Sequence, residues 1–151
     1  RRADEVLALL RSNVTSYVLV ASPRADTVEE ARFFATRLRA SQLEVAALIV
    51  NRSTPVFESG FDPAPTHRPR KRAVAVLYDN LVELTEMAAA ERRNLAPLVD
   101  HLALDADLAT TWVPLLAGDV HDLDGLETIR GLLFDGPDRR AALFDPAAPS
   151  G

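Results

Sequence analysis

Two short apolar runs decide the fold: SYVLVA at residues 16–21 and VAALIV at residues 45–50. Each is rich in β-branched side chains and is apolar at almost every position, a pattern typical of strands that helices cover on both faces. The first run ends at Ser22-Pro23 and the second at Asn51-Arg52. The two runs therefore predict buried strands of a parallel sheet.

Amphipathic helices are predicted around these strands, over residues 3–11, after residue 26, and from about residue 73 to residue 102. Thr27-x-x-Glu30 fits a capping box, so Asp26 or Thr27 is expected to cap the second helix. Pro97 predicts a break in the long third helix. The apolar stripes consist of Val6, Leu7, Leu9 and Leu10; of Val28, Ala31, Phe34, Ala35 and Leu38; and of Val74, Leu77, Tyr78, Leu81, Leu84, Ala88, Leu95, Leu98, Val99 and Leu102.

A third strand is predicted at residues 110–116, followed by a last helix at 123–133. The resulting order, α-β-α-β-loop-α-β-α, predicts an α/β domain: a three-layer α/β/α parallel sheet joined by right-handed crossovers. Residues 1–136 form this domain, residues 53–72 are expected to be a mobile loop, and residues 137–151 a flexible tail. Because three strands are few for an open parallel sheet, part of the domain is expected to lie outside this chain.

Composition excludes several classes of function. The chain has 151 residues and a net charge of −5, which argues against a nucleic-acid-binding protein. The basic run at residues 68–72 is interpreted as a solvated loop. Cysteine is absent and the three histidines lack ligand spacing, so a zinc site is not expected. No apolar run has the length of a transmembrane segment, and we expect a cytoplasmic protein.

The sequence lacks the loop that a nucleoside triphosphatase needs around the phosphates. Lys71 is the only lysine; no Gly-x-x-x-x-Gly precedes it, and Ala73 occupies the second position after it. No glycine-rich fingerprint follows a predicted strand, and a Gly-x-Ser-x-Gly nucleophile elbow is also absent. We therefore expect no ATP hydrolysis by this polypeptide alone.

An acidic turn precedes the last helix and contains Asp119, His121, Asp122 and Asp124. One interpretation is a metal or acid/base cluster. The other is an ordinary helix N-terminus, where a carboxylate caps the first turn and the helix dipole favours acidic residues.

Ligands of open α/β sheets bind beyond the carboxyl ends of the strands, and Asn51 stands at such an end. A side-chain amide offers one donor and one acceptor, which matches the amino edge of adenine. The alternative is a strand-end asparagine that bonds to local backbone. Pro114 and Leu115 offer flat apolar contact for a base, or simply pack in the core.

Three segments, in order, resemble the ArsA family of anion-transporting ATPases, which includes the ATPase that delivers tail-anchored membrane proteins. The run from Tyr17 to Pro23, followed by Val28-Glu29-Glu30-Ala31, is similar to the family's strand, proline and Glu-Ala helix. Leu48-Ile49-Val50-Asn51-Arg52 resembles its "V-V-N" strand, and the segment from Val113 to Val120 resembles its "P-L-x-A-G-E" segment. The match spans nearly the whole chain.

The resemblance implies the C-terminal, base-side part of a P-loop NTPase domain of the deviant Walker class, without its N-terminal half. Asn51 would form hydrogen bonds with the adenine of ATP or ADP, and Arg52 would reach the ribose or a partner subunit. The base would pack against Pro114, Leu115 and Leu116. Mg²⁺ would be bound through residues that this chain does not contain. The implied partner is an N-terminal catalytic half or another subunit in a homo- or heterodimer, and peripheral membrane association is compatible with it.

The sequence departs from the family's pattern at two places. No Cys-x-x-Cys pair follows the Asn51 strand, so a dimer bridged by zinc is excluded. His121-Asp122 stands where the family often has Arg-Gly, which puts the role of that closing loop in doubt.

Two other functions remain open beside the ATPase part. The chain could be a non-catalytic interaction module, or regulatory partner of an ATPase, in which the stripe from Val74 to Ala88 is an interface. A small Rossmann-like enzyme that uses the acidic turn from Asp119 to Asp124 is the third alternative, although no nucleophile or cofactor loop accompanies that turn.

Overall fold

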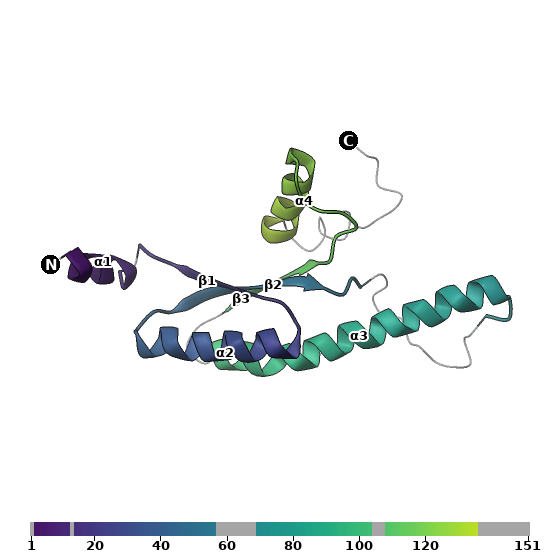
Figure 1. Cartoon of the computed structure of the whole chain (residues 1–151), viewed down its shortest axis with the longest axis horizontal. Helices are drawn as coiled ribbons and strands as arrows, with labels where there is room; N and C mark the ends of the chain where they lie inside the picture. The colour runs from purple at the N-terminus through teal and green to yellow at the C-terminus, as the bar shows by residue number, and fades with distance from the viewer. Residues whose placement is uncertain (1, 13, 57–68, 104–107, 136–151) are drawn as a thin grey trace.

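The computed structural model describes residues 2–12, 14–56, 69–103 and 108–135 (Figure 1). The order of helices and strands is the one that the sequence predicts. The elements are α1 (Arg2–Leu10), β1 (Tyr17–Ala21), α2 (Ala25–Ala40), β2 (Val45–Ser53), α3 (Arg72–Ala103), β3 (Ala109–Pro114) and α4 (Leu123–Phe134).

The three strands form one parallel sheet, as the sequence predicts, and their order in the sheet is β1-β2-β3. The connection from β1 to β2 contains α2, and that from β2 to β3 contains α3. Successive crossovers of one hand that step in one direction place their helices on the same face of a sheet. Both α2 and α3 accordingly lie on the same side of the sheet (Figure 1).

The core lies between this face of the sheet and the two helices. Leu48 and Val50 of the central strand have no exposed surface, and Leu98 of α3 is equally buried. Alternate positions of β1 and β2 face the helices, so the strands supply one apolar layer and the helices the other. These positions are Leu19, Ala21, Leu48 and Val50. The core cluster comprises Leu19, Ala21, Val28, Ala31, Ala35, Leu48, Val50, Leu95, Leu98 and Leu102.

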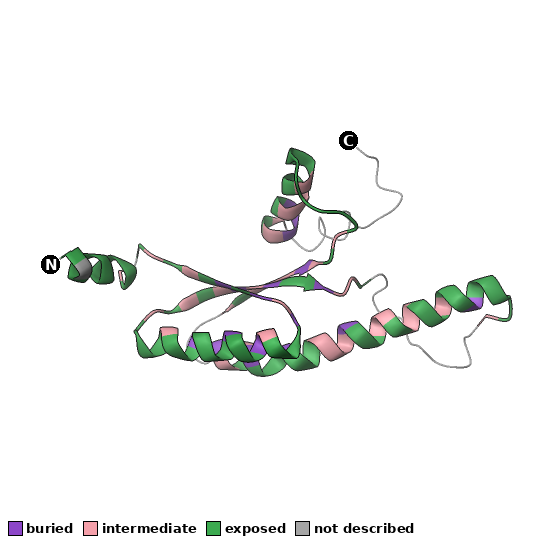
Figure 2. Cartoon of the chain, viewed as in Figure 1, coloured by how far each residue is buried: buried purple, intermediate pink, exposed green. Residues whose placement is uncertain are grey.

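The opposite face of the sheet is only partly covered, which corrects the expectation that both faces of β1 are buried. Val18 and Val20 are 52% and 57% exposed. Figure 2 colours the chain by burial and shows exposed positions along the strands. Helix α4 lies on this side and contacts β3, where Val113 and Leu132 are buried. Within the described residues, helices therefore cover this face beside β3 and leave it open over β1.

Helix α2 begins earlier than its capping signal predicts. It starts at Ala25 with Arg24 as the N-cap, and no side chain caps it. Asp26 lies inside the first turn, where its carboxylate accepts a hydrogen bond of 2.9 Å from the Thr27 backbone N–H. The prediction of a cap at Asp26 or Thr27 is therefore wrong, because Ser22-Pro23 ends the strand so abruptly that the helix begins before the Thr27-x-x-Glu30 motif. Phe34, which was expected in the buried stripe, is exposed.

Helix α3 runs unbroken through Pro97, so the predicted break does not occur. Its carboxyl-terminal half supplies Leu95, Leu98 and Leu102 to the core. Its amino-terminal half extends beyond the sheet (Figure 1). Leu77, in the predicted stripe, is 68% exposed.

Helix α1 lies beyond the β1 end of the sheet, away from the α2–α3 layer (Figure 1). Its amphipathic pattern forms the predicted helix, yet the stripe of Val6, Leu7 and Leu9 is exposed. The Arg11 side chain donates to the Ser41 carbonyl at 3.0 Å, and the Tyr17 hydroxyl donates to the Leu10 carbonyl at 3.0 Å.

Two predicted segments fall largely outside the described residues: most of the loop at 53–72, and the tail at 137–151. Ser53 belongs to β2 and Arg72 to α3. No helix within the described ranges is both long and apolar enough to cross a bilayer.

Candidate functional site

The carboxyl ends of β2 and β3 bring the predicted base-binding residues to one edge of the sheet. Asn51 pairs with Val113, and Ser53 pairs with Pro114. The Leu115 backbone N–H then donates to the Ser53 carbonyl at 2.8 Å, which continues the pairing past the end of β3. Asn51 and Pro114 therefore lie on neighbouring strands at the edge where ligands of open α/β sheets bind.

A bulge at Arg52 sets the direction of the side chains at this edge. Arg52 has a φ of 60°, in the left-handed region, and the register between β2 and β3 shifts between Asn51 and Ser53. In a regular strand, Arg52 would follow Leu48 and Val50 toward the helices. The extra residue resets this alternation, so that Arg52 is exposed and Ser53 is buried.

Asn51 lies on the face opposite to the core. Its pairing partner Val113 is buried outside the core cluster, on the side of α4. The Asn51 side chain is exposed, and no described group forms a hydrogen bond to its amide. The alternative of an asparagine that bonds to local backbone therefore finds no support in the described part of the chain.

The other predicted contact residues are accessible to different degrees. Leu115 is 54% exposed, whereas Pro114 and Leu116 are half-buried. Arg52 is exposed. This edge thus presents an amide and a guanidinium on one strand end and the exposed Leu115 on the next, a combination suited to a flat heterocycle with a polar edge. Pro114 instead pairs with Ser53 and lies on the α3 side of the sheet.

Sequence reasoning missed a pocket on the other face of the same strand ends, next to α3. Its volume is about 190 Å³, and Ser53, Thr54, Glu91, Arg92, Trp112 and Pro114 are among the residues that line it. The Glu91 carboxylate accepts from the Thr54 backbone N–H at 2.8 Å and from the Thr54 hydroxyl at 2.7 Å. The Arg92 guanidinium lies 5.5 Å from the centre of the Trp112 ring. The only sequence signal for this pocket is the polar Ser53-Thr54 pair, which Asn51 and Arg52 separate from the apolar run at residues 45–50.

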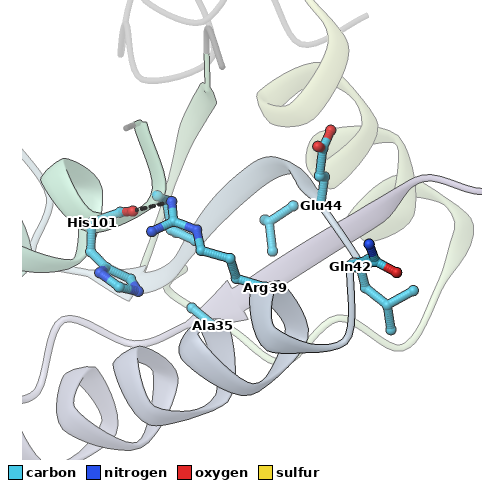
Figure 3. Close-up of a pocket in the computed structure, with 8 residues that line it drawn as sticks. Ala35, Arg39, Gln42, Glu44 and His101 are labelled. Carbon is cyan, nitrogen blue, oxygen red and sulfur yellow. Dashed lines mark hydrogen bonds between the residues drawn. The ribbon is translucent and has the colours of Figure 1, made fainter. Parts of the chain in front are cut away.

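A second pocket, of about 280 Å³, lies at the opposite end of the sheet (Figure 3). Arg39, Gln42 and Glu44 line it around the start of β2, and His101 lines it from α3. Arg39 donates to the His101 carbonyl at 3.0 Å, the dashed line in Figure 3. Because this pocket lies at the amino ends of the strands, it is less suited to the ligand of an open α/β sheet than the carboxyl edge.

The acidic turn before α4 is a helix cap. Asp122 is the N-cap residue, and its carboxylate accepts a 2.8 Å hydrogen bond from the Gly125 backbone N–H. His121 Nδ1 lies 2.8 Å from the Asp119 carbonyl oxygen. Among the described residues, which include all four members of this turn, no group of three acidic or histidine side chains is arranged to hold a metal ion. The geometry therefore supports the capping interpretation.

Charged side chains at the β1–α2 turn interact at the same edge of the sheet. The Arg24 guanidinium lies 3.3 Å from the Asp26 carboxylate. The hydrogen bond from Arg24, and after it the bond from the Thr27 backbone N–H, lowers the pKa of Asp26. The hydrogen bond to Asp26 and the attraction of its charge raise the pKa of Arg24. Both groups are exposed, so this ion pair contributes little to the stability of the fold.

Comparison with known proteins gives no family assignment. No protein-family model matches the chain, and no curated protein matches it. The function has to be inferred from the geometry of the strand ends.

Proposed function

We propose that this chain is the base-binding part of an ArsA-like ATPase. In this proposal, Asn51 reads the amino edge of adenine, Pro114, Leu115 and Leu116 form an apolar wall, and Arg52 reaches the ribose or a partner subunit. The observation that carries it is the exposed Asn51 amide, held by β2 directly beside the Val113–Pro114 strand end. The chain would hold ATP or ADP by the base and would not hydrolyse it alone.

The proposal includes the rest of the nucleotide site. The phosphate-binding loop and the Mg²⁺ ligands would come from an N-terminal catalytic half or a partner subunit. The sheet would then be the three-layer sheet of a P-loop NTPase, with additional elements over Val18 and Val20. The exposure of both side chains supports this part of the proposal, because an aliphatic strand face normally packs against another layer.

Ligand titration tests the base-side function. A site that holds only the base should bind adenosine, AMP, ADP and ATP with similar, weak affinity, with or without Mg²⁺. NMR titration of the labelled chain would measure these affinities, and Asn51→Ala should weaken all four about tenfold, the effect of losing a polar edge contact. Asn80→Ala, on the exposed face of α3, is the matched control. Affinity that increases with each phosphate and depends on Mg²⁺ would contradict the proposal, as would no adenosine binding at millimolar concentration.

A second candidate function is a non-catalytic interaction module, or regulatory partner of an ATPase. The observation that favours it is the exposure of apolar side chains, with Val74 and Leu77 in the predicted interface stripe of α3 and Val18 and Val20 on β1. Light scattering of the chain mixed with a candidate ATPase distinguishes the two functions. A stable complex without adenosine binding by this chain supports the module, and adenosine binding that depends on Asn51 supports the ATPase part.

A further inference from the structure

The pocket beside α3 combines polar and apolar side chains that could bind a small ligand. It lies at the carboxyl ends of β2 and β3, and its polar lining comes from Ser53, Thr54, Glu91 and Arg92. The Arg92 guanidinium lies over the Trp112 ring, so a ligand would contact Trp112 beside Arg92. Trp112 and Pro114 contribute apolar surface on the neighbouring strand. Its volume of about 190 Å³ is smaller than that of pockets for whole nucleotides or drug-sized ligands, roughly 300–1,000 Å³, and is suited to one planar ring system.

Ser53 is the first observation that points to a ligand. The residue is only 4% exposed, and it is the one buried polar residue among those described. No described group forms a hydrogen bond with its hydroxyl, although it lines the pocket. Buried hydroxyl groups in folded proteins almost always have a partner. The bulge at Arg52 turns Ser53 into this position, so the unsatisfied hydroxyl results from a specific backbone conformation.

Glu91 is the second, independent observation. Two hydrogen bonds from Thr54 fix its carboxylate at the pocket wall. Each carboxylate oxygen accepts one of these bonds and keeps capacity for another. The pocket therefore offers a fixed acceptor at Glu91 and a hydroxyl at Ser53 that can donate.

We propose that this pocket binds a small planar amino-heterocycle. The exocyclic amino group would donate to the Glu91 carboxylate, the adjacent ring nitrogen would accept from the Ser53 hydroxyl, and the ring would lie against Trp112. Asn51 lies on the opposite face of β2 and does not line this pocket, whereas Pro114 lines the pocket and is also a wall residue of the proposed Asn51 site. Binding in this pocket goes beyond the proposed function and does not depend on it.

Trp112 makes the proposal directly testable, since it is the only tryptophan of the chain. Its indole N–H gives a single NMR signal that reports on the pocket. Adenine is the probe, and purine, which lacks the amino group, is the matched control compound. Adenine should shift the Trp112 signal in a saturable manner, and purine should bind about tenfold more weakly because Glu91 then has no donor.

Ser53→Ala is the decisive variant. It removes an unsatisfied buried hydroxyl, so it should raise the thermal midpoint of unfolding while weakening adenine binding about tenfold. A serine with a purely structural role would show the reverse effect on stability. Asn80→Ala, at an exposed position of α3 outside both sites, should leave the adenine-induced shift of Trp112 unchanged.

Three results would overturn the proposal: no shift of Trp112 with millimolar adenine, equal binding of adenine and purine, or unchanged affinity in Ser53→Ala. Adenine binding that Asn51→Ala removes and Ser53→Ala does not would assign the ligand to the proposed nucleotide site alone. Adenine binding that follows Ser53, with no adenosine binding sensitive to Asn51, would support the pocket and contradict the proposed function.

Discussion

Arg52 is the residue on which the geometry of the candidate site depends. A left-handed backbone conformation costs a non-glycine residue about 1–2 kcal/mol, because the Cβ atom approaches the carbonyl oxygen. Here that conformation places Asn51 and Ser53 on opposite faces of one strand end. Both proposed binding sites thus depend on one unusual dihedral angle.

Arg52→Gly should stabilise the chain, because glycine adopts this φ without steric cost. After allowing for the greater flexibility of glycine in the unfolded chain, we expect a gain of about 0.5–1 kcal/mol in the free energy of unfolding. Urea denaturation measures it. Arg52→Ala keeps the Cβ atom and should show no gain, so an equal gain in both variants would mean that the arginine side chain, and not the backbone, is the cause.

Asp26 predicts a pH dependence at the turn between β1 and α2. Because Arg24 and the Thr27 backbone lower the pKa of this carboxyl in the folded chain, the ionised form is the one that folding favours. Its contribution to stability is therefore present above the unfolded pKa, about 3.9, and is lost as pH falls through the lower folded pKa. Denaturation at several pH values should show Asp26→Asn less stable than the unsubstituted chain at pH 7, with the difference vanishing in acid.

The exposure of this pair gives the control for that experiment. Salt screens exposed charges, so high ionic strength should reduce the difference between Asp26→Asn and the unsubstituted chain. A difference that persists in acid at its full size would show that the amide substitution acts through packing or helix propensity.

At the scale of elements, the sequence predicts the helices and strands well and their ends less well. The apolar runs at residues 16–21 and 45–50 match β1 and β2 because side chains that avoid water report directly on burial. The extension of β2 to Ser53 was not predictable, because a bulge leaves no signature in the pattern of apolar residues. The burial of Ser53, and with it the pocket, follows from that bulge and was missed for the same reason.

Helix α3 shows a second limit of local reasoning. Pro97 has no N–H to donate to the carbonyl of Arg93. The helix continues because Leu95 before the proline, and Leu98 and Leu102 after it, pack in the core. Tertiary packing thus outweighs the local preference of proline.

Pro97→Ala should therefore raise the free energy of unfolding by about 1–3 kcal/mol, through the restored N–H and the better helix propensity of alanine. Chemical denaturation followed by circular dichroism measures the change. Ala96→Gly, at an exposed neighbouring position, should lower stability by about 1 kcal/mol and serves as the control. Loss of stability in Pro97→Ala would indicate that the proline ring contributes packing that the helix needs.

At the scale of the whole molecule, the sheet has one complete interface and one incomplete interface. Helices α2 and α3 complete the first, whereas Val18 and Val20 remain exposed on the second. The sequence predicted strands that are covered on both faces. Apolar composition indicates which faces of a strand can be buried, but it does not indicate whether the covering layer belongs to the same polypeptide. The proposals of an ATPase part and of an interaction module both place a further layer here.

Val20→Lys tests whether this face is a contact surface. On an open face, lysine should change the free energy of unfolding by less than about 1 kcal/mol, the range of strand propensities. It should, however, abolish association with any partner that covers the face, because a charge would be buried without a counterion. Sedimentation velocity measures association, and Val14→Lys, at an exposed position outside the strands, is the control. Unchanged association in Val20→Lys would exclude this face from the interface.

Because β1 is an edge strand of the described sheet, its amide hydrogens should exchange with solvent at two different rates. In a parallel pair, alternate residues of an edge strand direct their N–H groups toward the neighbour and away from it. Only β2 pairs with β1 among the described strands, so every second β1 amide should exchange with solvent deuterium quickly while its neighbours exchange slowly. A strand donated by another polypeptide would slow the fast set alone. Hydrogen exchange along these five residues can therefore detect a partner before the partner is identified.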